Sequence, residues 1–415
     1  MSWPGCVTGL ACVRCGKRPA RGLDGPCPAC GPAGVLDVEY DLKRAGRTLT
    51  RAALRRRTPD AWRYEELLPL PPGARRPPLA PGGTPIYDTP RLARWVGLAR
   101  LLVKDEGRNP TASFKDRASA VGVARAGLRR ARVVACASTG NAATSLAGAA
   151  ASVGLPCAIF VPESAPEPKL AQLLIFGARV VRVQGSYDAT WELCQRACER
   201  HGWYNRNAAV NPSLVEGKKT AGLEVAEQCG DELPDWLAVS VGDGCTLAGI
   251  WKGLVQMQAL GFIPRLPRLL GVQAAGARPL VDAFESGGDF VPGPAQTLAD
   301  SICVGHPRNG QKALLAVRAS GGAFVAVPDE AILEAERETG RLTGLFGEPA
   351  AAAALAGLRQ AVAEGVIGRK ASALAMLTGS GLKDVRAALR AGGRPVDLPP
   401  DDAALDAHLR ERPLA

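Results

Sequence analysis

The stretch Asn109-Pro110-Thr111-Ala112-Ser113-Phe114-Lys115-Asp116-Arg117 places a lysine between an aromatic residue and an Asp-Arg pair. The Asn-Pro dipeptide favours a turn. The alanine-rich run that follows predicts a helix that begins near Lys115 and is capped by Thr111 or Ser113. Most lysines at a helix start are solvated surface charges. A lysine that is fixed and partly desolvated has a lowered pKa and can act as a nucleophile, so Lys115 is a candidate catalytic residue.

The composition is that of an ordinary globular protein without a membrane span. The chain has 415 residues, enough for two or three domains, with 47% hydrophobic and 22% charged residues. No run of eighteen apolar residues occurs, so we expect no transmembrane helix. The N-terminus lacks a basic region followed by an apolar stretch. We therefore expect a cytoplasmic protein rather than a secreted one.

The formal net charge is +11, carried mostly by arginines scattered along the chain. The densest basic run, Arg51 to Arg57, predicts a short helical face and has no interleaved aromatic residues. This pattern is weak evidence for nucleic-acid binding, and we expect no nucleic-acid partner. An enzyme that handles phosphorylated anions would show the same basic bias.

Four of the twelve cysteines, Cys12, Cys15, Cys27 and Cys30, form two C-x-x-C pairs separated by eleven residues. Glycines and prolines around them suit tight turns, and four thiolates in this arrangement predict a tetrahedral structural zinc site. Two disulfides or a redox pair are the alternatives, and a cytosolic setting argues against disulfides. The other eight cysteines follow no metal spacing and are interpreted as buried or incidental thiols.

Short apolar segments alternate with alanine-rich segments after residue 98. The expected strands are Ala99 to Glu106, Arg132 to Ala137, Cys157 to Val161, Arg179 to Val183, Trp236 to Val241 and Arg268 to Val272. Such alternation predicts an α/β protein with open, mostly parallel sheets.

Three further segments each follow an expected strand and open an expected helix. The first, Ser138 to Ser145, contains Ser-Thr-Gly-Asn and offers hydroxyls and backbone amides as an anion site, although a plain strand-to-helix turn explains it equally well. The second, Ser240 to Leu247, contains Gly-Asp-Gly, a weak phosphate-loop pattern when taken alone. The third, Met376 to Asp384, contains Thr-Gly-Ser-Gly-Leu-Lys-Asp.

Together with Ser113 to Arg117, these segments resemble, in order, the motifs of the threonine synthase-like family of fold-type II pyridoxal-phosphate enzymes. Weaker matches around Asn211 to Thr220 and Gly347 to Ala350 extend the resemblance over nearly the whole chain. The resemblance implies that Lys115, beside Phe114, carries pyridoxal phosphate as a Schiff base. It implies substrate carboxylate contacts from Ser138 and Thr139, with Thr144 and Ser145 nearby, and cofactor contacts from Asn141, Gly242, Asp243, Gly244, Cys245, Thr246 and Thr378.

In this family Asn141 would contact the cofactor's 3′-oxygen, and Thr378 would meet its pyridine nitrogen. A neutral hydroxyl at that nitrogen suits elimination and replacement better than transamination. Three residues depart from the family's pattern: Ala112 replaces a glycine, Asp243 an asparagine and Ser380 a histidine. We expect the Asp243 carboxylate to point away from the cofactor phosphate, because two anions repel each other.

The resemblance implies a tryptophan-synthase-like two-domain fold behind an N-terminal zinc ribbon. We expect the ribbon at 1–35, a small domain at 119–211, and a large domain built from 36–118 and 212–415.

The function that the resemblance implies is threonine synthase: O-phosphohomoserine and water give threonine and phosphate. The cationic and amide groups that would meet the leaving phosphate are Arg206, Asn207, Lys218 and Lys219. A β-replacement or β-elimination on an O-phosphoserine- or O-phosphothreonine-type substrate is the alternative. An inactive zinc-ribbon binding protein is the second alternative, against which the intact Lys115, Asn141 and Thr378 argue. We expect a small amino-acid substrate and a homodimer.

Overall fold

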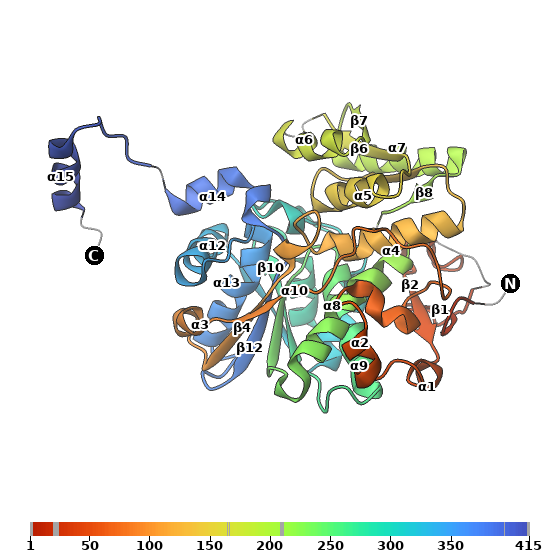
Figure 1. Cartoon of the computed structure of the whole chain (residues 1–415). Helices are drawn as coiled ribbons and strands as arrows, with labels where there is room; N and C mark the ends of the chain where they lie inside the picture. The colour runs from red at the N-terminus through yellow and green to blue at the C-terminus, as the bar shows by residue number, and fades with distance from the viewer. Residues whose placement is uncertain are drawn as a thin grey trace.

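Two parallel β-sheets form the body of the chain, as the alternating strands and helices predicted (Figure 1). The computed structural model describes residues 3–19, 25–163, 165, 167–207, 211–393 and 395–412. The six-stranded sheet has the order β11 (Ala323–Val327), β10 (Arg268–Ala274), β9 (Trp236–Ser240), β12 (Ser372–Leu377), β4 (Arg100–Asp105) and β3 (Ile86–Asp88), and only β3 is antiparallel. The four-stranded sheet has the order β7 (Arg179–Val183), β6 (Cys157–Pro162), β5 (Val134–Ala137) and β8 (Tyr204–Asn205).

Alternate residues of the larger sheet enter two separate hydrophobic cores. Leu237 and Val239 of β9 pack with the helices on one face, whereas Trp236 and Ala238 pack with the helices on the other. Because both faces are covered, the strands carry continuous apolar sequence instead of an apolar-polar alternation. The smaller sheet follows the same rule, with Val134 of β5 in one cluster and its neighbour in another.

Helices cover both faces of the larger sheet. Their bounds in the first half are α1 (Leu42–Ala45), α2 (Arg51–Arg56), α3 (Pro90–Val96), α4 (Lys115–Leu128), α5 (Asn141–Ala151), α6 (Glu167–Ile175) and α7 (Tyr187–His201). In the second half they are α8 (Ser213–Cys229), α9 (Cys245–Ala259), α10 (Pro279–Ser286), α11 (Gly310–Ala319), α12 (Asp329–Thr343), α13 (Pro349–Ala363), α14 (Val385–Gly392) and α15 (Asp402–Glu411).

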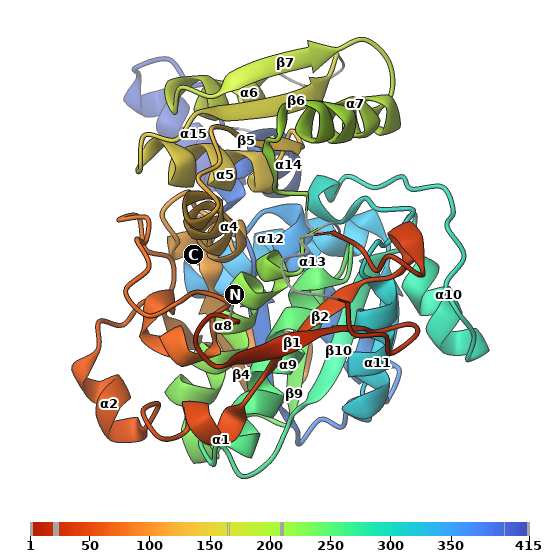
Figure 2. The ribbon, with the colours of Figure 1, turned by 90° about the vertical axis from the view of Figure 1, so that its right-hand side faces the viewer.

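The N-terminal segment forms an antiparallel hairpin of β1 (Val7–Cys12) and β2 (Leu36–Tyr40). Figure 2 shows this hairpin lying over the side of the body that is formed by α8 and α9. The hairpin has its own small apolar cluster, to which Cys12 and Cys27 contribute. Part of the loop between the two cysteine pairs lies outside the described residues.

The predicted fold class is confirmed, and each of the six expected strands corresponds to an observed strand. The sequence prediction did not include β3, β8, β11 or the β1–β2 hairpin. No helix among the described residues is long and apolar enough to cross a membrane.

Candidate active site

The loop before Lys115 is fixed by pairing with the segment that follows β12. The Phe114 backbone N–H donates to the Thr378 carbonyl at 2.8 Å, and the Ser380 N–H donates to the Ala112 carbonyl at 3.1 Å. The same segment bridges to Gly347, so three parts of the chain that are distant in sequence meet here. These bonds define where the Lys115 side chain begins.

The predicted helix cap at Lys115 was wrong. Helix α4 begins there without a side-chain cap, and the buried Asp116 carboxylate instead accepts from the Thr111 backbone N–H at 2.7 Å and from its hydroxyl at 2.6 Å. Ala112 has a φ of 62°, a left-handed conformation that favours glycine. The alanine in place of the family's glycine therefore stores about 1 kcal/mol of backbone strain beside the lysine.

Lys115 lies half-buried and faces an inner cavity. Burial, together with nearby Lys218 and Arg206, lowers the pKa of Lys115 to about 8, against the opposing effect of Glu348. A larger fraction of the amine is therefore neutral near physiological pH than for an exposed lysine. A neutral amine is the form that attacks a carbonyl group.

The glycine loop after β9 closes one end of this cavity. Gly242, Asp243, Gly244, Cys245 and Thr246 all line it, and α9 begins at Cys245. Gly244 has a φ of 85°, and a Cβ there would lie 2.9 Å from the Asn309 carbonyl oxygen, so only glycine fits. The Asp243 carboxylate accepts from the Arg308 backbone N–H at 3.3 Å. That it points away from a cofactor phosphate stays a prediction.

Two of the cations that were predicted to meet the substrate's leaving group line this inner cavity instead. Arg206 and Lys218 are each 2% exposed, and both lie among the residues around Lys115 and the glycine loop. Arg206 donates through Nε to the Ser119 hydroxyl at 3.1 Å, while its buried Nη2 has no partner among the described residues. Burial lowers the pKa of Lys218.

The other two residues of that prediction lie elsewhere. The Asn207 Oδ1 accepts from the Ala137 backbone N–H at 3.1 Å, and Asn207 lines neither cavity. Lys219 directly follows Lys218, but the helix turns its side chain about 100° away, and its Nζ donates to Glu216 at 2.6 Å. The placement of Asn207 and Lys219 at the leaving group was therefore wrong.

An outer cavity adjoins the inner one, and both are lined by Ser301, Glu348 and Ala350. Thr139, Asn141 and Thr144 line the outer cavity, as expected for the Ser-Thr-Gly-Asn segment. Helix α5 begins at Asn141, so its N-terminal end also lies at this cavity, although the Ala143 and Thr144 amides donate to the Gly140 carbonyl at 3.0 and 3.2 Å.

Two residues of the same segment do not line either cavity. Ser138 Oγ accepts from the Gly140 backbone N–H at 3.2 Å and shapes the turn. Ser145 points toward α4, where its hydroxyl lies 2.6 Å from that of Ser119. Ser138 and Ser145 therefore line neither cavity, and their contact with a substrate stays a prediction.

Glu348 was not predicted as a site residue. It is 6% exposed, lines both cavities, and accepts from Asn141 Nδ2 at 2.7 Å. Burial raises the pKa of Glu348, against the opposing effects of Asn141 and Lys115. The Asn141 amide is therefore held in one orientation by a buried carboxyl group. Thr378 lines the inner cavity, and Phe114 packs in the core behind it.

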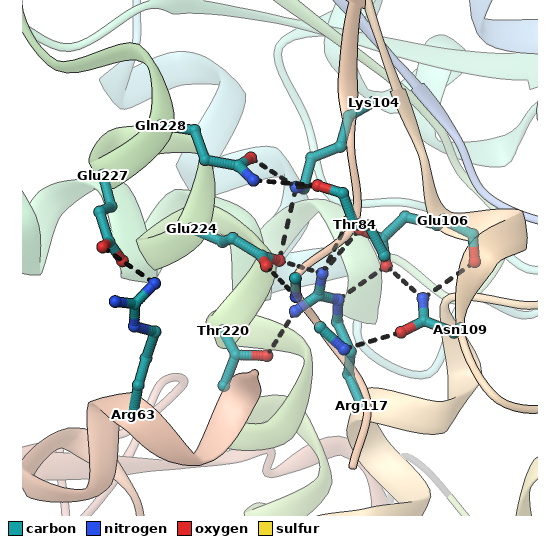
Figure 3. Close-up of polar contacts among 12 residues, drawn as sticks. Arg63, Thr84, Lys104, Glu106, Asn109, Arg117, Thr220, Glu224, Glu227 and Gln228 are labelled. Carbon is teal, nitrogen blue, oxygen red and sulfur yellow. Dashed lines mark hydrogen bonds and ion pairs between the residues drawn. The ribbon is translucent and has the colours of Figure 1, made fainter. Parts of the chain in front are cut away.

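A buried charge network lies behind the lysine helix (Figure 3). Arg117 donates to the two carboxylate oxygens of Glu106 at 2.7 and 2.8 Å, and it also pairs with Glu224. Lys104 approaches Glu224 at 3.4 Å. Because Arg117 is in the first turn of α4, this network fixes the helix from which Lys115 projects.

The inner cavity fits an aromatic aldehyde that carries a phosphate. One end has the amides at the start of α9, a loop whose Gly244 has no room for a Cβ, and an Arg206 Nη2 that lacks a partner among the described residues, all of which suit a phosphate. The other end has a half-buried lysine of lowered pKa, which suits an aldehyde. These are the two reactive ends of pyridoxal phosphate.

A second site is formed by the N-terminal cysteines. The sulfur atoms of Cys12, Cys15, Cys27 and Cys30 all lie within 4.8 Å of one another, and those of Cys15 and Cys27 are 3.8 Å apart. A zinc–sulfur distance of about 2.3 Å places tetrahedral sulfurs about 3.8 Å apart. All four thiols are free in the structure. The cluster therefore has the donors and the spacing that zinc requires.

Fold and site together define a class of enzyme that binds pyridoxal phosphate through a lysine. A family model described as pyridoxal-phosphate dependent enzyme matches residues 78–379. Threonine synthase of Methanocaldococcus jannaschii is 38% identical over 96% of this chain and 99% of its own length. The chain belongs to the threonine synthase-like family of pyridoxal-phosphate-dependent enzymes.

Two further comparisons agree. Threonine synthase of Methanosarcina acetivorans is 38% identical over 97% of this chain and 98% of its own length. The solved structure of diaminopropionate ammonia lyase from Escherichia coli superposes with a TM-score of 0.66 at 19% identity, covering 94% of this chain and 98% of that one. At that identity the likeness shows the shared fold alone.

Proposed function

We propose that this chain is a threonine synthase that converts O-phosphohomoserine and water into threonine and inorganic phosphate. The observation that carries the proposal is 38% identity to threonine synthases over almost the full length of both chains. The half-buried Lys115 at a cavity suited to pyridoxal phosphate supports it independently. Pyridoxal phosphate, when bound, withdraws electrons from the substrate and so acidifies its α-carbon.

The protein residues divide the remaining tasks. Lys115 holds the cofactor and then moves protons at the substrate's α-carbon, for which a pKa near 8 is suitable. The amides of Gly242 to Thr246, together with Arg206 and Lys218, bind the cofactor phosphate. Thr378 would offer a neutral hydroxyl to the pyridine nitrogen, and Asn141, oriented by Glu348, would contact the cofactor's 3′-oxygen.

The substrate carboxylate is bound in the outer cavity. Thr139, Thr144 and the amides at the start of α5 are the groups available there. Ser138 acts indirectly, because its hydroxyl shapes the turn that presents those amides.

A β-replacement or β-elimination on O-phosphoserine or O-phosphothreonine is the second candidate. It is favoured by Ser380, which stands where the family usually has histidine. Ser380 Oγ accepts from the Leu382 backbone N–H at 3.4 Å. A histidine's proton-transfer chemistry is thus missing from this position, and a shorter side chain replaces it.

The test is to incubate the purified enzyme separately with O-phosphohomoserine, O-phosphoserine and O-phosphothreonine, and to measure phosphate and the amino-acid product. Threonine from O-phosphohomoserine supports the proposal, whereas turnover of the other two alone moves the enzyme to the second candidate. Lys115→Ala is the control, because any phosphate that it releases does not come from this chemistry. Absence of phosphate from all three substrates would refute a phosphorylated substrate.

We also propose that Cys12, Cys15, Cys27 and Cys30 bind one structural zinc ion. Their spacing supports this assignment, and so does Gly34, where a Cβ would lie 2.5 Å from the Cys27 Cβ. Metal analysis should find about one zinc per chain, and Cys12→Ser should lose it. A metal-free wild type of full stability would contradict the proposal.

The domain division that we propose is the expected one, 1–35, 36–118 with 212–415, and 119–211, except that the first boundary moves to Tyr40 because β2 completes the hairpin. We further propose a cytoplasmic homodimer without a nucleic-acid partner. The exposed apolar side chains Val385 and Leu389 of α14 support dimerisation, because they lack cover within the described chain. Light scattering on the purified protein measures the oligomeric state directly.

A further inference from the structure

A second charge cluster, largely buried, joins the N-terminal hairpin to the body of the enzyme, and the Asp37 side chain at its edge is 32% exposed. Asp37 of β2 accepts from Lys252 Nζ of α9 at 3.0 Å and from Lys312 Nζ of α11 at 2.5 Å. Lys252 also donates to the Val38 carbonyl and to Glu216 of α8, both within hydrogen-bond distance. One aspartate of the hairpin thus holds two helices, and through Lys252 it reaches a third.

The cluster continues along α8. Glu216 accepts from Lys252 at 2.6 Å through one oxygen and from Lys219 at 2.6 Å through the other. The Lys219 ammonium lies 3.9 Å from the ring centroid of Tyr40, the last residue of β2. Glu216 and Lys219 are fully buried. Charges buried in this way are stable only while their partners remain, so loss of the hairpin's contribution would leave the cations around Glu216 under-compensated.

The three helices held by this cluster are those that surround the cofactor-phosphate end of the inner cavity. Lys218 lines that cavity and directly precedes Lys219 on α8. Helix α9 begins at Cys245 of the glycine loop. Helix α11 begins at Gly310, and the preceding Asn309 donates its backbone N–H to the Asp243 carbonyl at 2.9 Å. Displacement of any of these helices would move donors of the phosphate site.

The backbone next to Asp37 is paired with the segment that carries the first two cysteines. In the hairpin Asp37 is opposite Ala11, and the adjacent Leu36 is opposite Cys12. The Val13 backbone N–H donates to the Val35 carbonyl at 3.0 Å, and the Cys27 N–H donates to the Gly34 carbonyl at 2.7 Å. The residues that lead into β2 are therefore hydrogen-bonded to Val13, between the first two cysteines, and to Cys27 of the second pair. Through them the backbone that carries Asp37 is connected to both cysteine pairs.

We propose that metal at the four cysteines and cofactor at the inner cavity bind with positive coupling, transmitted through Asp37. The metal fixes β2, β2 fixes α8, α9 and α11, and these helices fix the phosphate donors. Coupling between two sites is reciprocal. Removal of the metal therefore weakens cofactor binding by the same factor by which removal of the cofactor weakens metal binding.

The experiment measures cofactor affinity without relying on turnover. Purified wild type is compared before and after zinc removal by a chelator, and the dissociation constant of pyridoxal phosphate is measured from its absorbance band. Zinc affinity is measured in parallel with and without cofactor. We expect about a tenfold weaker cofactor affinity after zinc removal, within the range usual for coupled sites.

Variants identify the connection. Asp37→Asn should weaken cofactor binding while zinc stays bound, and it should abolish the effect of the chelator. Glu39→Gln is the matched control, because Glu39 lies on the same strand but pairs with the exposed Arg18 at 2.9 Å. If Asp37→Asn does not fold, as judged by circular dichroism, Lys312→Met removes one of the two cations at Asp37 and should give a smaller loss.

The inference rests on the proposed zinc and cofactor sites, and the measurements separate its failure from theirs. Wild type without zinc, or without a cofactor band, would refute those sites. Zinc-bound wild type whose cofactor affinity is unchanged by zinc removal would overturn the coupling alone. The same conclusion follows if Asp37→Asn binds cofactor as tightly as Glu39→Gln.

Discussion

Replacing Arg117 by leucine should destabilise the enzyme more than any exposed charge substitution. Arg117 is fully buried and forms two hydrogen bonds to Glu106, at 2.7 and 2.8 Å, and an ion pair with Glu224. Leucine fills part of the volume but leaves both carboxylates without their principal cation. Removal of one partner from a buried ion pair costs about 3–5 kcal/mol, because the remaining charge is desolvated and uncompensated.

The pKa of Glu106 gives a second measure of the same interaction. Burial alone would raise this pKa, but Arg117, with a smaller contribution from Lys104, holds it down to about 2. Relative to an ordinary glutamate at about 4.3, this shift corresponds to about 3 kcal/mol of stability at neutral pH. Because the folded-state pKa is the lower one, that stability is present above about pH 4.3 and is lost as the pH falls toward 2.

Urea unfolding at pH 7.5, followed by circular dichroism and by the cofactor absorbance band, measures the effect. With a slope of roughly 2–3 kcal/mol per M, the midpoint of Arg117→Leu should fall by about 1–2 M. Arg108→Leu is the matched control, because Arg108 is 64% exposed and pairs with Asp105 in the same loop. Exposed pairs contribute about 0–1 kcal/mol. If Arg117→Leu unfolded together with this control, the reasoning about the buried network would be refuted.

Three further predictions concern the cavities. Lys115→Ala should abolish the borohydride-reducible cofactor adduct, and cofactor capture by the unliganded wild type should accelerate as the pH rises through about 8, because the neutral amine reacts. Glu348→Gln removes a charge that raises the Lys115 pKa, so the same pH profile should move to lower pH, whereas an unchanged profile would contradict their interaction. Lys383→Met should lower kcat/KM for O-phosphohomoserine by about 10–100-fold with cofactor affinity unchanged. Equal loss of cofactor binding would place Lys383 in the cofactor site instead.

The fold was largely predictable because its strands are buried on both faces. Continuous apolar runs bounded by turns identified six strands, and the bounds expected for β7 match those observed. Two of the strands that were missed are too short to be recognised from their own sequence and form by pairing with a neighbouring strand. β8 has two residues and exists through its pairing with β5, and β3 has three residues at the sheet edge. Such short segments have no periodicity of their own.

The site was predictable where a contiguous motif fixes the backbone. Lys115, the glycine loop and Thr378 meet at one cavity because each follows or opens a regular element. Side-chain direction was not predictable in the same way. Ser145 is four residues beyond Asn141, yet the packing of α5 against α4 turns it toward Ser119 instead of the cavity. Glu348 was missed because its role depends on Asn141, which is 207 residues away in sequence.

The two cavities contain different cationic side chains and so suit different anions. Arg206 and Lys218 lie with the glycine loop in the inner cavity, which is the proposed site of the cofactor phosphate. Among the described residues that line the outer cavity, Lys383 is the one cation, and it bonds Gln172 at 2.9 Å. If the amides at the start of α5 bind the substrate carboxylate, a substrate phosphate in that cavity is left with Lys383. Asp300, Glu348 and Asp384 line the same cavity, so Lys383 is the group among the described lining residues that offsets their repulsion of a dianionic leaving group. Replacing Lys383 by methionine removes that offset, so the expected loss falls on kcat/KM for the phosphorylated substrate and not on cofactor affinity.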